Sequence, residues 1–257
     1  MPDTSASESY RRIEGDARLG LILLADHARN TIPAEYHGLG MAPAEMQRHI
    51  AYDIGVEGVT EGLATRLGLP ALLTCFSRLL IDPNRGADDP TLIMRISDGA
   101  IVPGNARVDD AERARRIARF HKPYHDAVAR EIDACLAAGV VPALVAIHSF
   151  TPFWRGVPRP WHAGILWDRD PRFSNMFIEG LSAAGDIIVG DNEPYTGTLE
   201  GDTLNIHGSK RGLAHVLVEI RQDLIGGQSG VDEWVERLAR ILEPAMKDPA
   251  LHRAEVW

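Results

Sequence analysis

The chain has 257 residues, of which 45% are hydrophobic and 25% charged, and its formal net charge is −9. This composition is that of an ordinary globular protein with enough chain to bury a core. The acidic balance and the lack of a dense Lys/Arg cluster exclude a nucleic-acid-binding protein. We expect residues 1–16 to form a flexible tail and residues 17–257 to form one domain, because no linker or low-complexity run divides them.

Targeting and redox features are also absent from the sequence. The two cysteines are too few for a disulfide framework and lack CxxC spacing. No signal-peptide core precedes the first predicted strand, and no run approaches the roughly 20 apolar residues that span a bilayer. We therefore expect a cytoplasmic protein that does not associate with membranes.

Short apolar runs alternate along the chain with longer segments of helical periodicity, which is typical of an α/β sheet covered by helices. The predicted strands are Leu19–Ala25, Ala71–Phe76, Arg78–Asp82, Pro142–Ser149, His162–Trp167, Asp186–Val189 and His215–Arg221. The predicted helices are Pro43–Leu67, Asp109–Ala138, Arg172–Ala184 and Val231–Met246. Several strands are apolar throughout, so we expect helices on both faces of the sheet. The Asp-, Gly- and Pro-rich segment 83–108 is too long for an idle connection and is predicted to form part of a pocket or lid.

Polar residues follow several predicted strands at the point where each strand ends. Ligands of open α/β sheets bind beyond the carboxyl ends of the strands, so these residues are candidates for a site. His27 and His148 both occupy such positions, and neutral imidazole is the commonest nitrogen ligand of zinc. A catalytic zinc site needs a third protein ligand, for which a carboxylate is expected. Asp53 and Asp26 are the candidates, with Asn30 as a weaker neutral donor.

The segment SRLLIDPNRG places Arg78, Asp82, Asn84 and Arg85 within one predicted strand and its exit turn. A guanidinium binds a carboxylate through two parallel hydrogen bonds, and an asparagine adds a neutral donor beside it. Asn84 and Arg85 therefore suit recognition of a substrate carboxylate. The alternative interpretation is a DPN turn followed by a surface arginine.

Glu219 lies near the end of the apolar run HVLVEIRQD, beside Arg221. General-base activation requires a carboxylate next to the attacking water, and this position makes Glu219 the candidate base. A salt bridge at the strand end is the alternative. Arg221 and Ser149, the last residue of PALVAIHS, are candidate substrate contacts.

Weaker candidates lie elsewhere in the chain. His121 and His125 are four residues apart, but Pro123 between them argues against a helix that supplies two metal ligands, so we expect one in the pocket and neither on the metal. His49 would share a helix face with Asp53 and is a candidate partner of that carboxylate. The segments RPWHAG and DNEPY are candidate substrate contacts that turn chemistry also explains. GxSxG, GxxxxGK[ST] and GxGxxG motifs are absent, which argues against serine hydrolases, P-loop enzymes and dinucleotide-binding proteins.

Eight segments in consistent order resemble the N-formylglutamate amidohydrolase family: DHARNTIP, HIAYDIGV, SRLLIDPNR, SDGAIVPGN, IHSFTP, RPWHAGILW, DNEPY and VEIRQDL. That family is related to zinc carboxypeptidases and aspartoacylases. The resemblance therefore implies a zinc-carboxypeptidase-like α/β fold, in which a mixed, mostly parallel sheet lies in a three-layer α/β/α arrangement. It also implies that residues 17–257 form a single catalytic domain.

By this resemblance, His27 and His148 are the two histidine ligands of the metal. Zinc carboxypeptidases and aspartoacylases carry an HxxE motif, whereas this chain has Asn30 at the glutamate position. Asp53 is the candidate replacement for that ligand, and Asn30 is the alternative. The implied cofactor is Zn²⁺ or another divalent metal.

The resemblance also assigns roles around the metal. Asp82, Asn84 and Arg85 match the DxNR motif shared with the aspartoacylases, in which the asparagine and arginine hold the substrate carboxylate. Arg78 is placed like the arginine that polarises the scissile carbonyl, and Glu219 is placed like the general base. Asp82 is then a residue that supports the site without binding the metal.

The implied function is a metal-dependent amidohydrolase that cleaves the N-acyl amide, N-formyl in the first instance, of a small acidic amino acid such as N-formylglutamate. The expected partner is this small substrate, and the expected assembly is a monomer or a small homo-oligomer. Two alternatives share the fold. One is a related deacylase or carboxypeptidase-like peptidase, and the other is a non-catalytic carboxylate-binding protein that has lost the metal with the HxxE glutamate.

Overall fold

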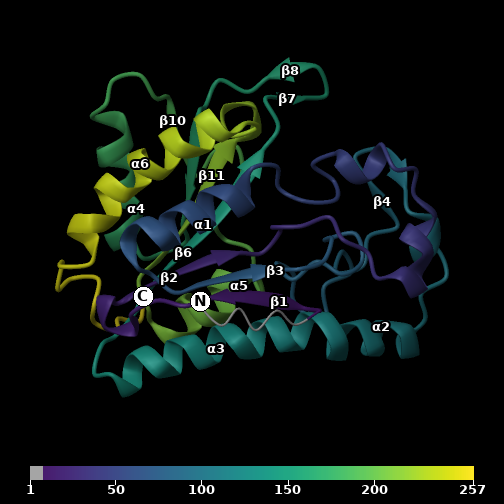
Figure 1. Ribbon diagram of the computed structural model, residues 1–257, viewed down its shortest axis with the longest axis horizontal. Helices are drawn as coiled ribbons and strands as arrows, with labels where there is room; N and C mark the ends of the chain where they lie inside the picture. The colour runs from purple at the N-terminus through teal and green to yellow at the C-terminus, as the bar shows by residue number, and fades with distance from the viewer. Residues whose placement is uncertain (1–7) are drawn as a thin grey trace.

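The computed structural model describes residues 8–257, whose backbone is built around one seven-stranded mixed sheet (Figure 1). The strand order is β1-β3-β2-β6-β11-β9-β10. Strands β3, β2, β6 and β11 are parallel to one another, whereas β1 runs antiparallel to β3 and β9 antiparallel to β11. The strands are β1 (Tyr10–Ile13), β2 (Leu21–Ala25), β3 (Ala71–Thr74), β6 (Ala143–Phe150), β9 (Ala163–Leu166), β10 (Val189–Asp191) and β11 (His215–Arg221).

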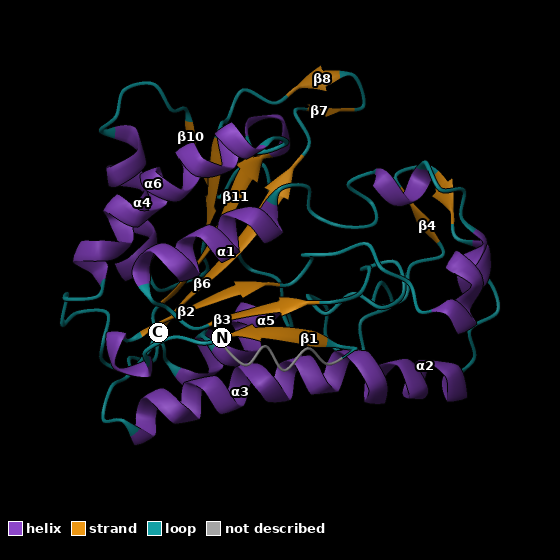
Figure 2. Cartoon of the chain, viewed as in Figure 1, coloured by secondary structure: helices purple, strands orange, loops and turns teal. Residues whose placement is uncertain are grey.

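Helices cover both faces of the sheet, as Figures 1 and 2 show. Helices α1, α4 and α6 pack on one face, and α3 and α5 pack on the other. Two small hairpins, β4–β5 and β7–β8, stand outside the main sheet. The elements are α1 (Val56–Leu67), α2 (Asp110–Arg116), α3 (Lys122–Ala137), α4 (Arg172–Ser182), α5 (Thr203–His207), α6 (Gln228–Ala245), β4 (Ile96–Ser97), β5 (Ala100–Ile101), β7 (Phe153–Trp154) and β8 (Val157–Pro158).

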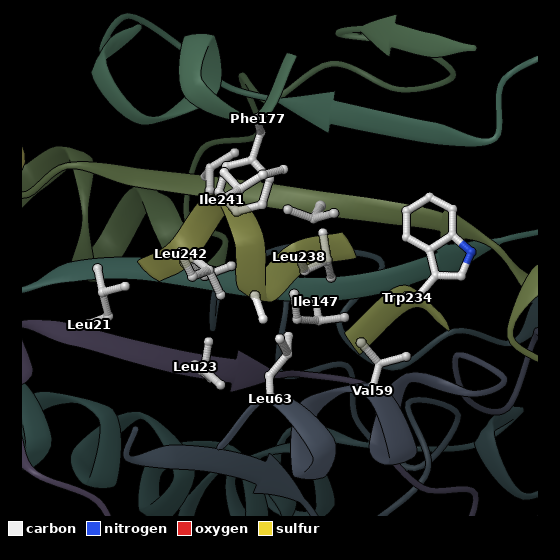
Figure 3. Packing of buried hydrophobic residues seen from close by; sticks show 14 of the residues in the cluster. Leu21, Leu23, Val59, Leu63, Ile147, Phe177, Trp234, Leu238, Ile241 and Leu242 are labelled. Carbon is white, nitrogen blue, oxygen red and sulfur yellow. The ribbon is translucent and has the colours of Figure 1, made fainter. Parts of the chain in front are cut away.

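The all-apolar strand β2 shows why the sheet needs two helical layers. Leu21 and Leu23 point to the face covered by α1 and α6, where they join the core that Figure 3 shows. Ile22 and Leu24 point to the opposite face, where they pack with α3. Alternate residues of a strand face opposite sides, and each fully buried leucine or isoleucine contributes roughly 1.5–3 kcal/mol. The predicted α/β fold with three layers and a mixed sheet is confirmed.

The predicted strand Arg78–Asp82 is wrong, because this segment forms a turn outside the sheet. Its apolar residues Leu79, Leu80 and Ile81 are fully buried in a separate cluster that also contains Phe120. Residues of segment 83–108 pack into the same cluster, so the apolar run reflects burial beneath a long loop. A short apolar run has this ambiguity, since periodicity alone does not show what covers it.

The predicted helix Pro43–Leu67 is also corrected. Only a single 3₁₀ turn forms at Glu45–Gln47, and α1 begins at Val56. Gly55 precedes it with φ = +83°, and a Cβ there would lie 2.3 Å from the carbonyl oxygen of Ile225, so glycine is required at this turn. His49 and Asp53 consequently do not share a helix face.

The N-terminal segment is more ordered than predicted. Residues 10–13 form β1 and pair with β3 along its outer edge, so the expected tail does not extend to residue 16. Residues 1–7 of that expected tail lie outside the described residues. Within residues 8–257, no helix combines the length and apolar character needed to cross a membrane.

Candidate metal centre and active site

A cavity of about 450 Å³ opens where the carboxyl ends of β2, β6 and β11 meet. In the sheet, β3 lies on one side of β2 and β6 lies on the other side. The direction in which the chain adds strands to the sheet therefore reverses at β2. Ligands of open α/β sheets bind at such points. The cavity brings together most of the residues predicted from the sequence, namely His27, Asp53, Arg78, Asn84, Arg85, His148, Ser149 and Glu219.

His27 and His148 face a shared carboxylate at the floor of this cavity. The Nδ1 atoms of His27 and His148 lie 3.3 and 2.9 Å from Oδ2 of Asp53. One potential ligand atom from each of the three residues lies within 4.8 Å of the other two, and all three side chains are buried. Two imidazoles and one carboxylate are a donor set typical of catalytic zinc sites.

Backbone contacts bring Asp53 to this position although it lies 26 residues beyond His27. The Asp53 amide donates to the carbonyl oxygen of His27 at 2.9 Å. The irregular segment between the 3₁₀ turn and α1 therefore docks on the end of β2. Helical backbone at Asp53 would use that amide within the helix, which explains why the predicted helix is interrupted here.

Two further carboxylates contact the other ring nitrogen, Nε2, of each histidine. Nε2 of His27 is 2.7 Å from Oδ1 of Asp82, and Nε2 of His148 is 3.0 Å from Oδ2 of Asp26. Metal-binding histidines characteristically donate their other ring N–H to a carboxylate, which fixes the tautomer and leaves the first nitrogen free for the metal. The residues present therefore fit a zinc-type ion.

The charges in this centre favour a bound cation. Burial alone would raise the pKa of Asp53, but His27 and His148 hold it below its ordinary value. Burial would likewise lower the pKa of His148, but its hydrogen bonds with Asp26 and Asp53 raise it well above its ordinary value. Positive charge is thus stabilised where the two histidines meet Asp53.

Two residues that the sequence did not single out hold Asp26 in place. The hydroxyl groups of Tyr124 and Thr203 each donate to Oδ1 of Asp26 at 2.8 Å. Both oxygens of Asp26 are therefore used behind His148, which separates Asp26 from the ligand group. Tyr124 lies on a helix and Thr203 follows the N-cap residue of α5, so no local pattern pointed to either one.

Glu219 projects into the cavity from β11, opposite His148 of β6 in the parallel register. Its Oε2 atom is buried and has no hydrogen-bond partner in the described residues. Burial raises the pKa of Glu219 to about 7, although the positive charge of His148 opposes this shift. A buried carboxylate oxygen without a hydrogen-bond partner costs free energy. Its position therefore indicates where a bound ligand or water donates a hydrogen bond.

Arg78 lies beside the metal-type centre on the turn that replaces the predicted strand. Its Nη2 is 2.8 Å from Oδ2 of Asp82, and its Nη1 is 3.5 Å from Oδ1 of Asp53. Burial would lower the pKa of Arg78, but these carboxylates raise it, so the guanidinium stays charged. A fixed cation at this distance from the ligand group suits stabilisation of a developing oxyanion.

Asn84 presents a side-chain amide to the cavity, and Arg85 presents a guanidinium cation. Oδ1 of Asn84 accepts a hydrogen bond from the Thr203 amide at 3.0 Å, which leaves its amide group oriented. Arg85 donates to the Asn84 carbonyl at 2.7 Å and to Thr91 at 3.2 Å. Within residues 8–257, Arg85 forms no ion pair, so its charge is free for a substrate carboxylate.

His121 and His125 support this loop from behind, and neither lines the cavity, which corrects the prediction that one would. The Nε2 atoms of His121 and His125 lie 2.9 Å from the carbonyl oxygens of Arg85 and Pro83. A π-helical turn at Ile117–His121 joins α2 to α3 and includes His121. Such turns are rare and recur at functional sites.

Arg221 is used differently from the prediction, because it does not line the cavity. Its guanidinium pairs with Asp223 at 2.8 Å and donates to the carbonyl oxygens of Arg159 and Trp161 at 3.3 Å each. The prediction that Arg221 contacts a substrate is therefore wrong for this cavity. Arg221 instead holds the backbone of the RPWHAG segment.

Ser149 is the predicted substrate contact on β6, and Asn30 is the alternative metal ligand. Ser149 lines the cavity, but its hydroxyl donates to the carbonyl oxygen of Ile54 at 2.9 Å. The side-chain amide of Asn30 donates to the carbonyl oxygen of Met46 at 2.7 Å, away from the histidines. Asn30 therefore lies outside the group formed by the two histidines and Asp53.

Comparisons with known proteins identify the family of the chain. The model of the N-formylglutamate amidohydrolase family matches residues 19–226. The gene product Atu2144 from Agrobacterium tumefaciens has a similar structure, with 31% identity, a TM-score of 0.87, and coverage of 94% of this chain and 96% of that chain. The N-formylglutamate amidohydrolase from Ralstonia eutropha JMP134 shares the fold at 22% identity and a TM-score of 0.68, over 94% of this chain and 98% of that chain. No curated protein sequence matches. Since the family match covers most of the chain, the protein belongs to the N-formylglutamate amidohydrolase family.

Proposed function

We propose that this protein is a zinc-dependent amidohydrolase that cleaves the amide bond of a small N-acyl amino acid, with N-formylglutamate as the first substrate to test. The observation that carries the proposal is the buried group of His27, Asp53 and His148, whose histidines are oriented by two further carboxylates. The unpartnered oxygen of Glu219 lies on the strand next to that group.

Each residue around the centre has its own role in the proposed reaction. A zinc ion held by His27, Asp53 and His148 would supply Lewis acidity toward a water molecule and the scissile carbonyl. Glu219 accepts the proton of the attacking water and then donates it to the leaving amine. Arg78 donates hydrogen bonds to the oxyanion that develops on the acyl carbon.

The free cation of Arg85 and the amide of Asn84 fix the amino-acid end of the substrate. They bind its α-carboxylate, which places the amide bond within reach of Glu219. Arg85 carries no protein counter-ion in the described residues, because its hydrogen bonds go to Thr91 and to the Asn84 carbonyl, so its charge is available to pair with that carboxylate.

The test is amine release from N-formyl, N-acetyl and longer N-acyl amino acids, measured before chelation, after chelation and after zinc is restored. Metal content is determined on the same samples, and Asp53→Asn is the matched variant. We expect turnover that chelation removes, zinc restores and Asp53→Asn abolishes. Turnover that survives complete metal removal contradicts the metal-dependent proposal. Ligand binding without turnover in the zinc-loaded protein supports a non-catalytic carboxylate-binding protein.

A further inference from the structure

Aromatic rings form one wall of the cavity. Phe150 at the end of β6, Trp154 of the hairpin β7–β8 and Tyr195 beyond β10 all line it, and we call these three residues the aromatic wall. Trp154 is 41% exposed and Tyr195 is 44% exposed, although tryptophan is highly buried on average. The uncovered ring surface is apolar area that a ligand in the cavity can remove from water.

Arg159 contacts all three rings of the aromatic wall from behind. Its Cζ atom lies 5.0 Å from the ring centroid of Tyr195, 5.4 Å from that of Trp154 and 5.6 Å from that of Phe150. Such distances allow cation–π attraction, which is stronger where the cation is removed from water. Arg159 is only 9% exposed and does not itself line the cavity. Rings from three separate segments of the chain therefore share one buried cation.

Backbone contacts fix the loops that carry these side chains. The Arg159 amide donates to the carbonyl oxygen of Pro152 at 2.8 Å. Gly164 of β9 lets the loop before Tyr195 pack against the sheet, because a Cβ at Gly164 would lie 2.1 Å from the carbonyl oxygen of Glu193. The aromatic wall is therefore held by the fold on the β9–β10 side of the metal-type centre.

Unpaired positive charge in the cavity comes from Arg85. Among the arginines and lysines that line the cavity in the described part of the chain, Arg78 pairs with Asp82 at 2.8 Å, whereas Arg85 has no carboxylate partner. His49 also lines the cavity, and burial lowers its pKa, so its imidazole is neutral at pH 7. A second carboxylate on a substrate would lose water without gaining a cation, which costs free energy.

The aromatic wall and Arg85 lie near opposite ends of segment 195–202, most of which lines the cavity between them. Tyr195 at the first end belongs to the wall. Gly201 at the other end lies beside Gly86, the neighbour of Arg85, because a Cβ on Gly86 would lie 3.5 Å from the Cα atom of Gly201. An N-acyl amino acid carries its carboxylate and its acyl group on opposite sides of the scissile bond. With the carboxylate on Arg85, the acyl group extends toward the aromatic wall.

We propose that the aromatic wall binds an apolar acyl group, so that the preferred substrate has a single carboxylate and an apolar chain or ring in place of formyl. The cavity volume of about 450 Å³ lies in the range of pockets that bury ligands much larger than an N-formyl amino acid. Arg159 is a positioning residue, because it holds the rings without reaching the substrate. The inference rests on the proposed function for the position of the scissile bond but not for the apolar binding site.

Hydrolysis of four substrates tests the proposal, with N-acetylalanine as the reference. N-phenylacetylalanine adds an apolar acyl group, N-acetylphenylalanine adds an apolar side chain, and N-acetylglutamate adds a second carboxylate. We expect N-phenylacetylalanine to raise kcat/KM by roughly tenfold or more over the reference, mainly through KM, because its ring is removed from water. An equal or larger gain from N-acetylphenylalanine or N-acetylglutamate overturns the proposal.

Variants connect this preference to the aromatic wall. We expect Trp154→Ala, Tyr195→Ala and Arg159→Gln each to lower the ratio of kcat/KM for N-phenylacetylalanine to that for N-acetylalanine by roughly threefold or more. Partial unfolding would lower both values alike and leave the ratio unchanged. Arg155 is exposed and contacts the same Trp154 ring at 5.7 Å, so Arg155→Gln is the control that keeps the ratio. A wild-type ratio in Arg159→Gln refutes its positioning role, and a wild-type ratio in both ring variants overturns the proposal.

Binding of carboxylates that contain no amide bond separates this inference from the proposed function. Calorimetry with zinc present compares 5-phenylpentanoate, pentanoate and adipate, which differ at the end away from their shared carboxylate. If 5-phenylpentanoate binds most tightly and Trp154→Ala removes its advantage, the apolar site stands even when no substrate is hydrolysed. If adipate binds as tightly, or if the advantage survives in Trp154→Ala, the site is refuted even when the enzyme is active.

Discussion

Glu219 is the side chain on which the proposed reaction depends most directly. Replacing it by glutamine keeps the shape of the side chain but removes its ability to accept a proton. We expect Glu219→Gln to lower kcat by roughly 10²- to 10⁴-fold, the usual contribution of a general base. Steady-state kinetics on the best panel substrate measure this change. Metal content should stay at the wild-type level, and full activity in this variant would refute the base assignment.

Asp26 allows a second test at the scale of one residue, with a readout that does not require turnover. Its carboxylate accepts a hydrogen bond from Nε2 of His148, so Asp26→Asn keeps a hydrogen-bond acceptor but removes the charge. We expect zinc affinity to fall by about 10- to 100-fold, as is typical of residues that orient a metal ligand. Competition with a chromophoric chelator measures the affinity. The control is Asp223→Asn, whose carboxylate pairs with Arg221 outside the cavity, and an equal loss in both variants would contradict the assigned role.

At the scale of elements, the histidine contact between α3 and α5 makes stability depend on pH. Nδ1 of His125 lies 3.0 Å from Nε2 of His207, and burial lowers the pKa of His125 to about 3 and that of His207 to about 4. In the unfolded chain both pKa values return to about 6.5. The unfolded state therefore binds more protons below pH 6.5. The stability these residues contribute is present above that pH and is lost as the pH falls toward 4.

Replacing His207 tests this contribution. We expect His207→Asn to reduce the slope of the unfolding free energy between pH 6.5 and 4.5 by up to about 1.4 kcal/mol per pH unit, the amount for one proton. Urea unfolding at several pH values measures the slope. The exposed His37 supplies the control His37→Asn. An unchanged slope in His207→Asn would show that the histidine contact does not govern acid stability.

The sequence predicts the elements whose cause is local and misses those that depend on tertiary contacts. Strand β11 has the predicted bounds, because an apolar run flanked by turns can be identified from the sequence. His27, His148 and Glu219 could be singled out for a related reason, since binding sites of α/β sheets lie at the carboxyl ends of the strands. Asp53 was named, but its irregular backbone was not predicted, because the contact with the His27 carbonyl is not local. The contact of the Arg159 guanidinium with the Tyr195 ring could not be predicted either, since only the folded sheet brings their loops together.

At the scale of the whole molecule, β1 links the two helical layers. Successive residues of a strand point to opposite faces, so Arg11 pairs with Glu61 of α1 while Arg12 pairs with Glu131 of α3. Nε of Arg12 lies 2.6 Å from Oε2 of Glu131, a residue that is only 4% exposed. The segment that the sequence suggested to be a tail is therefore a structural connection between opposite faces of the sheet.

This connection can be measured through Arg12. We expect Arg12→Ala to lower the free energy of unfolding by roughly 1–3 kcal/mol, because it leaves the buried Glu131 carboxylate without its partner. Adding Glu131→Gln should restore part of the loss. Urea unfolding measures both variants, and the exposed pair of Arg18 with Asp16 supplies the control Arg18→Ala, with a cost below about 0.5 kcal/mol. A cost for Arg12→Ala as small as that of the control would show that β1 does not stabilise the fold.

The reversal of strand direction between β11 and β9 has a consequence for how substrate preference can change. Because β9 is antiparallel to β11, the chain that leaves β6 after Phe150 reaches the start of β9 without crossing the sheet. The intervening residues 151–162 carry the exposed hairpin β7–β8 as well as Thr151 and Trp154, which line the cavity. Both ends of this segment are fixed by strands, so its length and side chains can vary while the histidines and Glu219 keep their places. Exchange of this single surface loop is therefore a route by which one hydrolytic centre can acquire different substrates.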